Sequence, residues 1–139
     1  MTLSIRNQFP GTVTEVRPGE VTALVKVRLA GGQELTAAIT LEAAEQLGLA
    51  PGSPVRALVK STEVSLSSGR IEGLSIRNQL PGAITRLDLG EVMASVKVAV
   101  AGGELTAVIT KDAVEELGLF VSSDVVALIK ATEVSLAVD

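Results

Sequence analysis

The stretch VTALVKVRLAGGQELTAAIT, residues 21–40, decides the fold of this chain. Alternate side chains from Val25 to Leu29 are apolar, and Lys26 and Arg28 between them are charged. This period of two is typical of a β-strand with one buried face. The AGG in the middle predicts a hairpin turn. It does not predict a phosphate-binding loop, because neither glycine leads into a helix. The stretch therefore predicts two neighbouring strands joined by a tight turn.

Further strand signals lie on both sides of this hairpin. Segments rich in Val, Leu and Thr predict strands at 11–16 (GTVTEV), 55–60 (VRALVK) and 62–66 (TEVSL). Segments with Pro and Gly predict turns between them, at Pro10 and Gly11, around Gly19 and around Gly52.

One short helix is predicted after the hairpin. Thr40 can cap its N-terminus, Glu42 suits the positive end of the helix dipole, and Gly48 can supply a left-handed stop. Thr110 and Gly118 repeat this design later in the chain. About five strands with one helix after the third long strand predict a small Greek-key barrel of the OB type.

The chain is one unit written twice. Residues 4–32 and 34–66 align with residues 75–103 and 104–136, Gln33 is the only unmatched position, and well over half of the aligned positions are identical. The segment SSGRIEG between the copies predicts a flexible linker. We therefore predict an all-β protein of two tandem five-stranded OB-like barrels, each with one short helix. The predicted parts are a first domain at 1–66, a linker at 67–73 and a second domain at 74–139.

Composition excludes several classes of function. The 139 residues include no Cys and no His, which argues against zinc, copper and iron–sulfur sites, disulfides, and Ser–His or Cys–His catalysis. A formal charge of -4 and only two Phe argue against a nucleic-acid surface, which needs basic charge and stacking aromatics. No secretory signal and no apolar run of about 20 residues is visible, so we expect a soluble cytoplasmic protein that neither enters a membrane nor catalyses a reaction.

Oligomerisation is expected from size and hydrophobicity. Each unit has about 65 residues, and a module of that size buries only about 60% of its unfolded surface. Because 47% of the chain is hydrophobic, we expect part of this surface to be buried between copies or between chains.

The pentapeptide SIRNQ occurs at residues 4–8 and again at 75–79. Its serine, arginine, asparagine and glutamine are hydrogen-bond donors, and Lys60, Ser61 and Thr62 add a charge and two hydroxyls where a strand ends. Donors of these kinds converging on one spot describe an oxyanion receptor, to which the helix start at Thr40 or Thr110 could add N–H groups. A plain structural alternative remains open: Arg6 could pair with Glu63, and Lys60 could be a solvated strand end.

The chain also resembles a known family. LSIRNQFPGTVTEV, TAAIT and TAVIT, the LGL after each helix, and ALVKSTEV and ALIKATEV are similar to the Mop domain of bacterial molbindins. The likeness covers nearly all of both halves, so two tandem Mop domains resemble a di-Mop molbindin. The resemblance implies barrels assembled in a ring, here a homotrimer, with molybdate held at subunit interfaces and tungstate able to replace it. It implies a role in molybdenum storage or homeostasis.

The resemblance also implies which residues bind the oxyanion. In the family, the S-x-R-N motif of one domain meets the K-[SA] strand of a neighbour. The residues carried over are Ser4, Arg6, Lys60 and Ser61 for one set, and Ser75, Arg77, Lys130 and Ala131 for the other. Weaker candidates are Ile5, Asn7, Thr40, Ile76, Asn78 and Thr110. Two alternative functions remain: an anion-sensing regulatory or scaffold module, and binding of a molybdenum–pterin cofactor.

Overall fold

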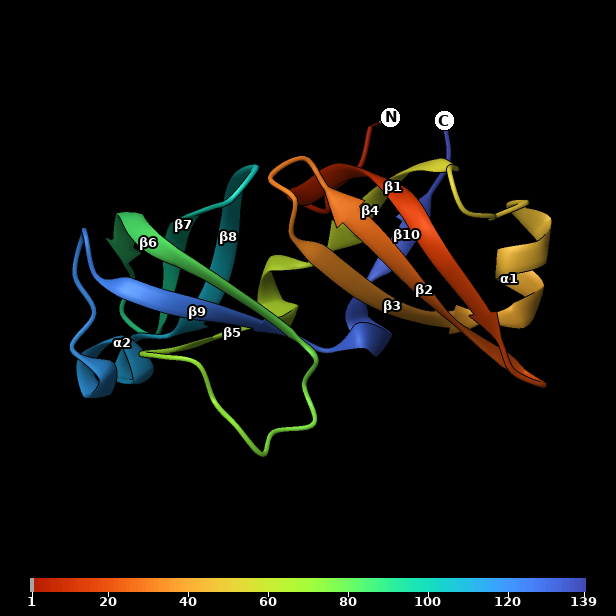
Figure 1. The fold of residues 1–139 in the computed structure, drawn as a ribbon. Coiled ribbons are helices and arrows are strands. Elements are labelled where there is room, and N and C mark those ends of the chain that lie inside the picture. The colour runs from red at the N-terminus through yellow and green to blue at the C-terminus, as the bar shows by residue number, and fades with distance from the viewer. Residues whose placement is uncertain (1) are drawn as a thin grey trace.

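The structure, a computed structural model, describes residues 2–139 and consists of two curled five-stranded antiparallel sheets that lie side by side (Figure 1). The first sheet contains β1 (Asn7–Pro18), β2 (Thr22–Leu29), β3 (Glu34–Thr40), β4 (Pro54–Val59) and β10 (Ser135–Ala137). The second contains β5 (Val64–Ser67), β6 (Asn78–Leu89), β7 (Met93–Val100), β8 (Gly103–Thr110) and β9 (Asp124–Ile129). The predicted all-β architecture of two OB-like barrels is confirmed.

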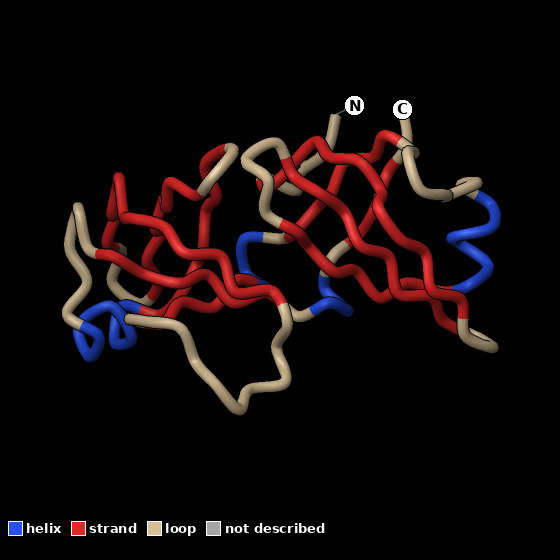
Figure 2. Tube along the Cα trace, viewed as in Figure 1, coloured by secondary structure: helices blue, strands red, loops and turns tan. Residues whose placement is uncertain are grey.

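The helices are short and lie in two places. The α-helices α1 (Leu41–Gln46) and α2 (Lys111–Leu117) lie at the outer ends of the molecule. Two 3₁₀ turns, η1 (Ser61–Glu63) and η2 (Ala131–Glu133), lie between the sheets (Figure 2). No helix among residues 2–139 combines the length and the apolar character needed to cross a membrane.

The alternation in residues 21–29 forms the core as predicted. Ala23, Val25, Val27 and Leu29 of β2 are all buried, and β2 pairs with β1 on one side and β3 on the other. Side chains that alternate between the two faces of a strand place every second residue in the core. Burying a Val or Leu side chain contributes about 1.5–3 kcal/mol, and burying an Ala methyl contributes less.

Both α-helices begin and end where the sequence predicts. The Thr40 hydroxyl accepts a hydrogen bond from the Ala43 N–H at 3.1 Å, and Thr110 caps α2 in the same way. Gly48 and Gly118 each follow a helix with a φ of 62°, the left-handed conformation that glycine adopts without a steric cost.

Pro10 and Gly11 do not form the predicted turn. Both lie inside β1, where Pro10 pairs with Arg56 and Gly11 with Val55 of β4. A Cβ on Gly11 would lie 2.6 Å from Val27 Cγ1 and 2.7 Å from the Arg28 carbonyl oxygen. Glycine occupies position 11 because the backbone of β2 lies too close to β1 for a larger side chain. Pro10 and Gly11 therefore belong to a continuous strand and do not form a turn.

Each sheet takes one edge strand from the other repeat. The strand orders are β10-β4-β1-β2-β3 and β5-β9-β6-β7-β8, so β5 of the first repeat completes the second sheet and β10 of the second repeat completes the first. In Figure 1, β10 (blue) runs beside β4, and β5 (yellow-green) runs beside β9. The sequence repeats and the two barrels therefore divide the chain differently.

The two barrels also meet through paired asparagines. The buried Asn7 accepts a hydrogen bond from the Thr106 N–H at 2.8 Å, and its amide donates to the Thr106 carbonyl at 2.9 Å. Asn78 makes the same two bonds to Thr36, both at 2.8 Å. Each asparagine thus holds the backbone of a strand in the opposite sheet, and we call the surface between the sheets the seam.

Candidate functional site

Strand pairing brings the first polar motif to the end of a lysine-containing strand. In the antiparallel pair β1–β4, Asn7 lies opposite Val59. Arg6 precedes Asn7 and Lys60 follows Val59, so both cations lie at the same end of the pair. The chain then turns through η1, which packs against β8 of the other repeat. The motif therefore lies beside the seam.

A pocket of about 370 Å³ opens at this place. We call it the seam pocket; its lining residues are Ser4, Ile5, Arg6, Lys60, Ser61, Thr62 and Val108. It contains two cations and three hydroxyl groups and no carboxylate. Arg6 and Glu63 do not form an ion pair within residues 2–139, so the structural alternative for Arg6 is wrong. An anion is the kind of ligand that such a lining favours.

The seam pocket combines residues in a way that the resemblance did not imply. The resemblance implies that the serine–arginine motif of one domain meets the lysine strand of a neighbouring domain. Here Ser4, Arg6, Lys60 and Ser61 all come from the first repeat, because β1 and β4 pair within one sheet. The second repeat contributes Val108 of β8 to the wall.

The donors in the seam pocket differ in their present contacts. The Arg6 guanidinium is held by its own segment: Nε donates to the Ser4 carbonyl at 3.2 Å and Nη2 to the Leu3 carbonyl at 2.8 Å. The Ser61 hydroxyl is buried and has no hydrogen-bond partner within residues 2–139. An unpaired buried hydroxyl costs about 1–3 kcal/mol, so this group stands to gain from a polar ligand.

Several weaker candidates have other contacts in the structure. Asn7 and Asn78 are 2% and 3% exposed, and their side-chain amides bond to Thr106 and Thr36 across the seam. The hydroxyls of Thr40 and Thr110 cap α1 and α2, and neither residue lines the seam pocket. Ile5 is in its wall.

The backbone conformation of Lys130 in the second repeat is the same as that of Lys60 in the first. Lys130 has φ −66° and ψ 138°, against −66° and 139° for Lys60, so Ala131 presents its N–H as Ser61 does. Asn78 lies opposite Ile129, which puts Arg77 and Lys130 at one end of the pair β6–β9. Ala131 lacks the hydroxyl of Ser61.

Arg77 and Ile76 line a different pocket of about 280 Å³, formed with the segment between the repeats. Its full lining is Arg70, Ile71, Glu72, Gly73, Leu74, Ile76, Arg77 and Gln79, and we call it the linker pocket. Ser75, which precedes these two motif residues, is exposed and lines neither pocket.

Sequence reasoning missed Val108 and Arg70. Val108 sits in the regular pattern of β8, so nothing in its own sequence context assigns it to a site in the other repeat. Arg70 had one signal: it is the one cation of the segment SSGRIEG and lies seven positions before Arg77.

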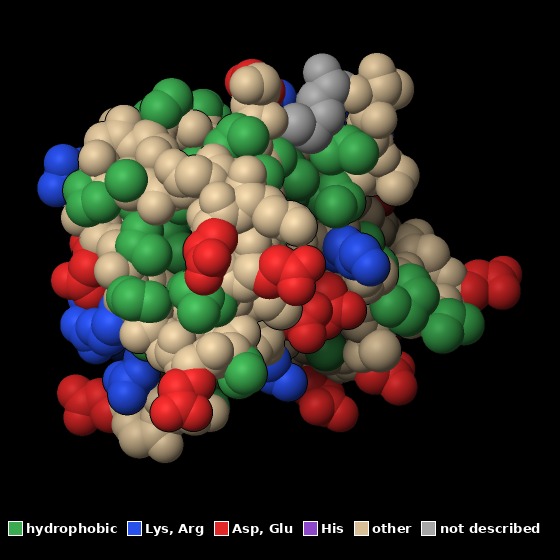
Figure 3. Space-filling view, turned by 90° about the vertical axis from the view of Figure 1, so that its right-hand side faces the viewer, with side chains coloured by type: hydrophobic (Ala, Val, Ile, Leu, Met, Phe, Trp, Pro, Cys, Tyr) green, Lys and Arg blue, Asp and Glu red, His purple; other side chains and the backbone are tan. Residues whose placement is uncertain are grey.

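Metal-ligand clusters are missing from the described part of the chain, and one face of the molecule has no continuous basic surface. Among residues 2–139, no three Asp, Glu, His or Cys side chains gather as they would around a metal ion. The face shown in Figure 3 mixes acidic and basic side chains. The donors described above suit a small anion better than a cation or a polyanion.

A family model supplies the identification. The model of the TOBE domain matches residues 3–66 and again residues 74–136. The chain belongs to the TOBE domain family. The tandem, Mop-like organisation inferred from the alignment of the two repeats and their shared motifs is confirmed by this double match.

Three relatives of this TOBE protein have names that refer to molybdenum or molybdate. "Molybdenum transport protein ModE" of Herbaspirillum seropedicae is 40% identical over 99% of this chain, and "Molybdenum-pterin-binding protein MopB" of Rhodobacter capsulatus is 42% identical over 96%. The matches cover 52% and 50% of those proteins, so the chain spans about half their length. A crystal structure of the cytoplasmic molybdate-binding protein ModG with molybdate bound matches with a TM-score of 0.97 and 43% identity over the whole of both chains.

Proposed function

We propose that this protein binds molybdate in the cytoplasm and serves molybdenum storage or homeostasis. The observation that carries the proposal is the seam pocket, where Arg6 and Lys60 accompany the unpartnered Ser61 hydroxyl without any carboxylate. The similarity to ModG, MopB and ModE supports the same ligand. Binding and release of the ion need no catalytic group.

The chemistry of the anion fits this lining. Molybdate near neutral pH is a fully deprotonated tetrahedral dianion, so it accepts hydrogen bonds and donates none. A pocket with donors and no carboxylate suits this anion, whereas a protonated anion such as hydrogen phosphate finds only neutral hydroxyl acceptors for its own proton there. Tungstate has the same charge and shape and should replace molybdate. Sulfate shares the charge, so discrimination against it depends on size.

A second copy of the chain would complete the seam pocket. Arg6 and Lys60 are exposed in the single chain, and water weakens the attraction between exposed charges. Covering the pocket with another subunit would exclude this water, which supports a site at a subunit interface in a homotrimer. Ser75, Arg77, Lys130 and Ala131 form the second proposed set of donors.

Removal of both motif arginines tests the assignment. Arg6→Ala combined with Arg77→Ala should weaken molybdate binding about ten- to hundredfold, because each hydrogen bond to a charged group contributes about 1.5–3 kcal/mol. Isothermal titration calorimetry measures the affinity. Thermal unfolding without ligand should change little, since both side chains are exposed.

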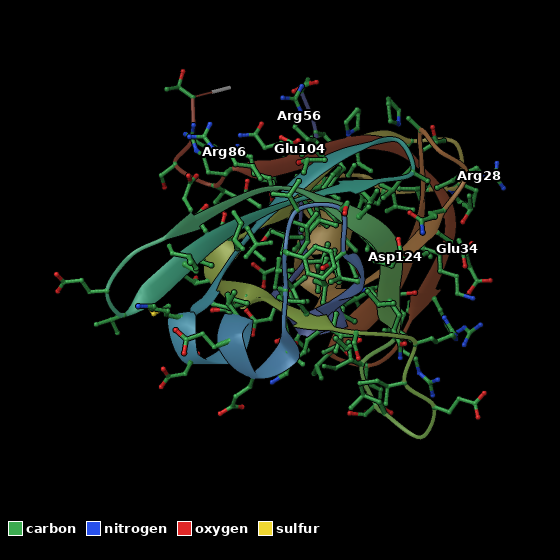
Figure 4. The ribbon with its side chains drawn as sticks, turned by 90° about the vertical axis from the view of Figure 1, so that its left-hand side faces the viewer. Arg28, Glu34, Arg56, Arg86, Glu104 and Asp124 are labelled. Atoms are coloured by element: carbon green, nitrogen blue, oxygen red, sulfur yellow. The ribbon has the colours of Figure 1, made fainter. Side chains whose placement is uncertain are left out.

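The control is Arg28→Ala combined with Arg86→Ala, two exposed arginines labelled in Figure 4 that lie outside both pockets. It makes the same change in net charge and should keep full affinity. In the wild type, molybdate at a hundred times its Kd should add about 2.7 kcal/mol to stability. Full affinity in the Arg6/Arg77 variant would contradict the site assignment.

Two other functions were considered for the same site. A molybdenum–pterin ligand is suggested by the name of MopB, but Phe9 is buried in the core and Phe120 lies outside the seam pocket, so neither can stack a pterin there. A sensing role is favoured by the similarity to a relative named "Transcriptional regulator ModE". Molybdate retained through gel filtration at several ions per oligomer supports storage, and rapid loss of the ion supports sensing.

A further inference from the structure

The segment between the repeats is fastened to the second SIRNQ motif. Residues 67–73 form an arch below the second barrel, light green in Figure 1. Gln79 accepts a hydrogen bond from the Ile71 N–H at 3.1 Å and donates one to the Ile71 carbonyl at 2.9 Å. A second donation reaches the Ile76 carbonyl at 3.4 Å. The Gln79 amide therefore holds the arch in place.

The first repeat has no such arch. The equivalent Gln8 donates to the Ile5 carbonyl at 3.0 Å and accepts from Arg56 Nη1 at 3.2 Å. The two copies of one pentapeptide thus have different surroundings, although their sequences are identical.

The arch adds one cation and one anion to the second motif. Arg70 and Glu72 line the linker pocket together with Arg77. Neither arginine donates a hydrogen bond or forms an ion pair within residues 2–139, whereas the Arg6 guanidinium donates to two carbonyls. Each guanidinium carries N–H groups in a fixed fork that can bind a tetrahedral oxyanion, and two of them line this one pocket.

The Glu72 carboxylate bears on which oxyanion the linker pocket prefers, a protonated or a fully deprotonated one. A carboxylate repels an oxyanion that has lost all its protons, but it accepts a hydrogen bond from one that still carries a proton. Phosphate near neutral pH is partly protonated, and molybdate is not. The seam pocket, which contains no carboxylate, has the opposite preference.

We propose that the linker pocket is an oxyanion site in which Arg70 joins Arg77, and that Glu72 makes it bind hydrogen phosphate better than the seam pocket does. The proposal deepens the proposed function, because Arg77 belongs to the second set of molybdate donors. The two motifs then differ in specificity: the first binds deprotonated dianions, and at the second phosphate competes with molybdate.

Calorimetric titration with inorganic phosphate at constant ionic strength tests the proposal on the full chain. Arg70→Ala should weaken phosphate binding about three- to tenfold, the range expected for an exposed charged hydrogen bond. Gln79→Ala should weaken it similarly by releasing the arch. Arg6→Ala should leave phosphate binding unchanged while reducing molybdate binding. Glu72→Gln should lower the ratio of phosphate affinity to molybdate affinity at this site.

Two matched controls separate the arch from general charge effects. Arg86→Ala removes a cation at the end of the second barrel opposite to the arch (Figure 4), and Gln8→Ala removes the equivalent glutamine; both should bind phosphate like the wild type. The proposal is overturned if wild type takes up no phosphate, or if Arg70→Ala and Arg86→Ala give the same titration. Failure of the proposed function is a different result, in which Arg6→Ala retains full molybdate affinity.

Discussion

At the scale of single residues, Ser122 has an unusual backbone. It is the only residue other than glycine in 2–139 with a positive φ, at 82°, and the aligned residue of the first repeat is Gly52 with a φ of 96°. The left-handed region costs a residue with a Cβ about 1–2 kcal/mol, and glycine avoids this cost. The same turn is therefore strained in one repeat and relaxed in the other.

Ser122→Gly should stabilise the protein by about 0.5 kcal/mol. Relief of backbone strain exceeds the extra freedom that glycine gives the unfolded chain. Urea denaturation measures the change. Gly52→Ser is the reciprocal variant and should destabilise, since no atom lies near a Cβ at that position and only the backbone angle matters. Changes of the same sign in both variants would contradict this explanation.

At the scale of elements, the exchanged edge strands join the repeats. Ser135, Leu136 and Ala137 of β10 pair with Leu58, Ala57 and Arg56 of β4. Without β10 the first sheet would expose the backbone edge of β4, and β9 would keep its partner β5.

Deletion of residues 135–139 should therefore expose the first barrel, although the deleted residues belong to the second repeat. Hydrogen exchange followed by mass spectrometry should show faster exchange in β4 and little change in β9. Deletion of residues 138 and 139 alone is the control, because it leaves β10 intact and removes only the exposed Val138 and Asp139, the latter an ion-pair partner of Arg56 at 3.6 Å. Faster exchange in β9 and not in β4 would disprove the pairing.

The sequence predicts the barrels well and their exchange poorly. The alternation in β2 and the caps at Thr40 and Thr110 are local signals, and the structure confirms them. The exchange of the edge strands β5 and β10 has no local signal in the sequence. The segment TEVSL is identical at 62–66 and at 132–136, so sequence does not distinguish pairing with β4 from pairing with β9. Pro10 and Gly11 were predicted wrongly because the close approach of β2, a tertiary contact, overrides the usual turn preference.

The candidate site shows the same division. Arg6, Lys60 and Ser61 were predicted, and the register of β1 with β4 brings them into one pocket. Val108 and Arg70 could not be assigned, because the first depends on the packing of η1 against β8 and the second on the contact of the arch with Gln79.

At the scale of the whole molecule, the seam unites the barrels. The Asn7 and Asn78 amides bond to backbone groups of the opposite sheet, and the turns that contain Gly31 and Gly102 touch backbone to backbone. A Cβ on Gly31 would lie 2.5 Å from the Ala101 carbonyl carbon, so only glycine permits this contact. The two barrels should therefore unfold as one cooperative unit.

Asn7→Ala should destabilise this unit by about 2–4 kcal/mol, because it leaves both the N–H and the carbonyl of Thr106 unpaired in the seam. Chemical denaturation monitored by circular dichroism gives the value, and the transition should remain single. Gln46→Ala is the control: this exposed amide bonds only to Glu42 at 3.4 Å, and its loss should change stability by no more than about 0.5 kcal/mol. A change that small for Asn7→Ala would show that the seam bonds are dispensable.

The exchange of edge strands also imposes an order on biosynthesis. On the ribosome β1 to β4 emerge first, yet their sheet cannot be completed until the second repeat has been translated through Ala137. In the interval the nascent β4 edge can pair with β5, which carries the same TEVSL segment. Wherever that pairing forms, β5 has to leave β4 for β9 before the native sheets are complete, and this strand replacement follows translation of both repeats.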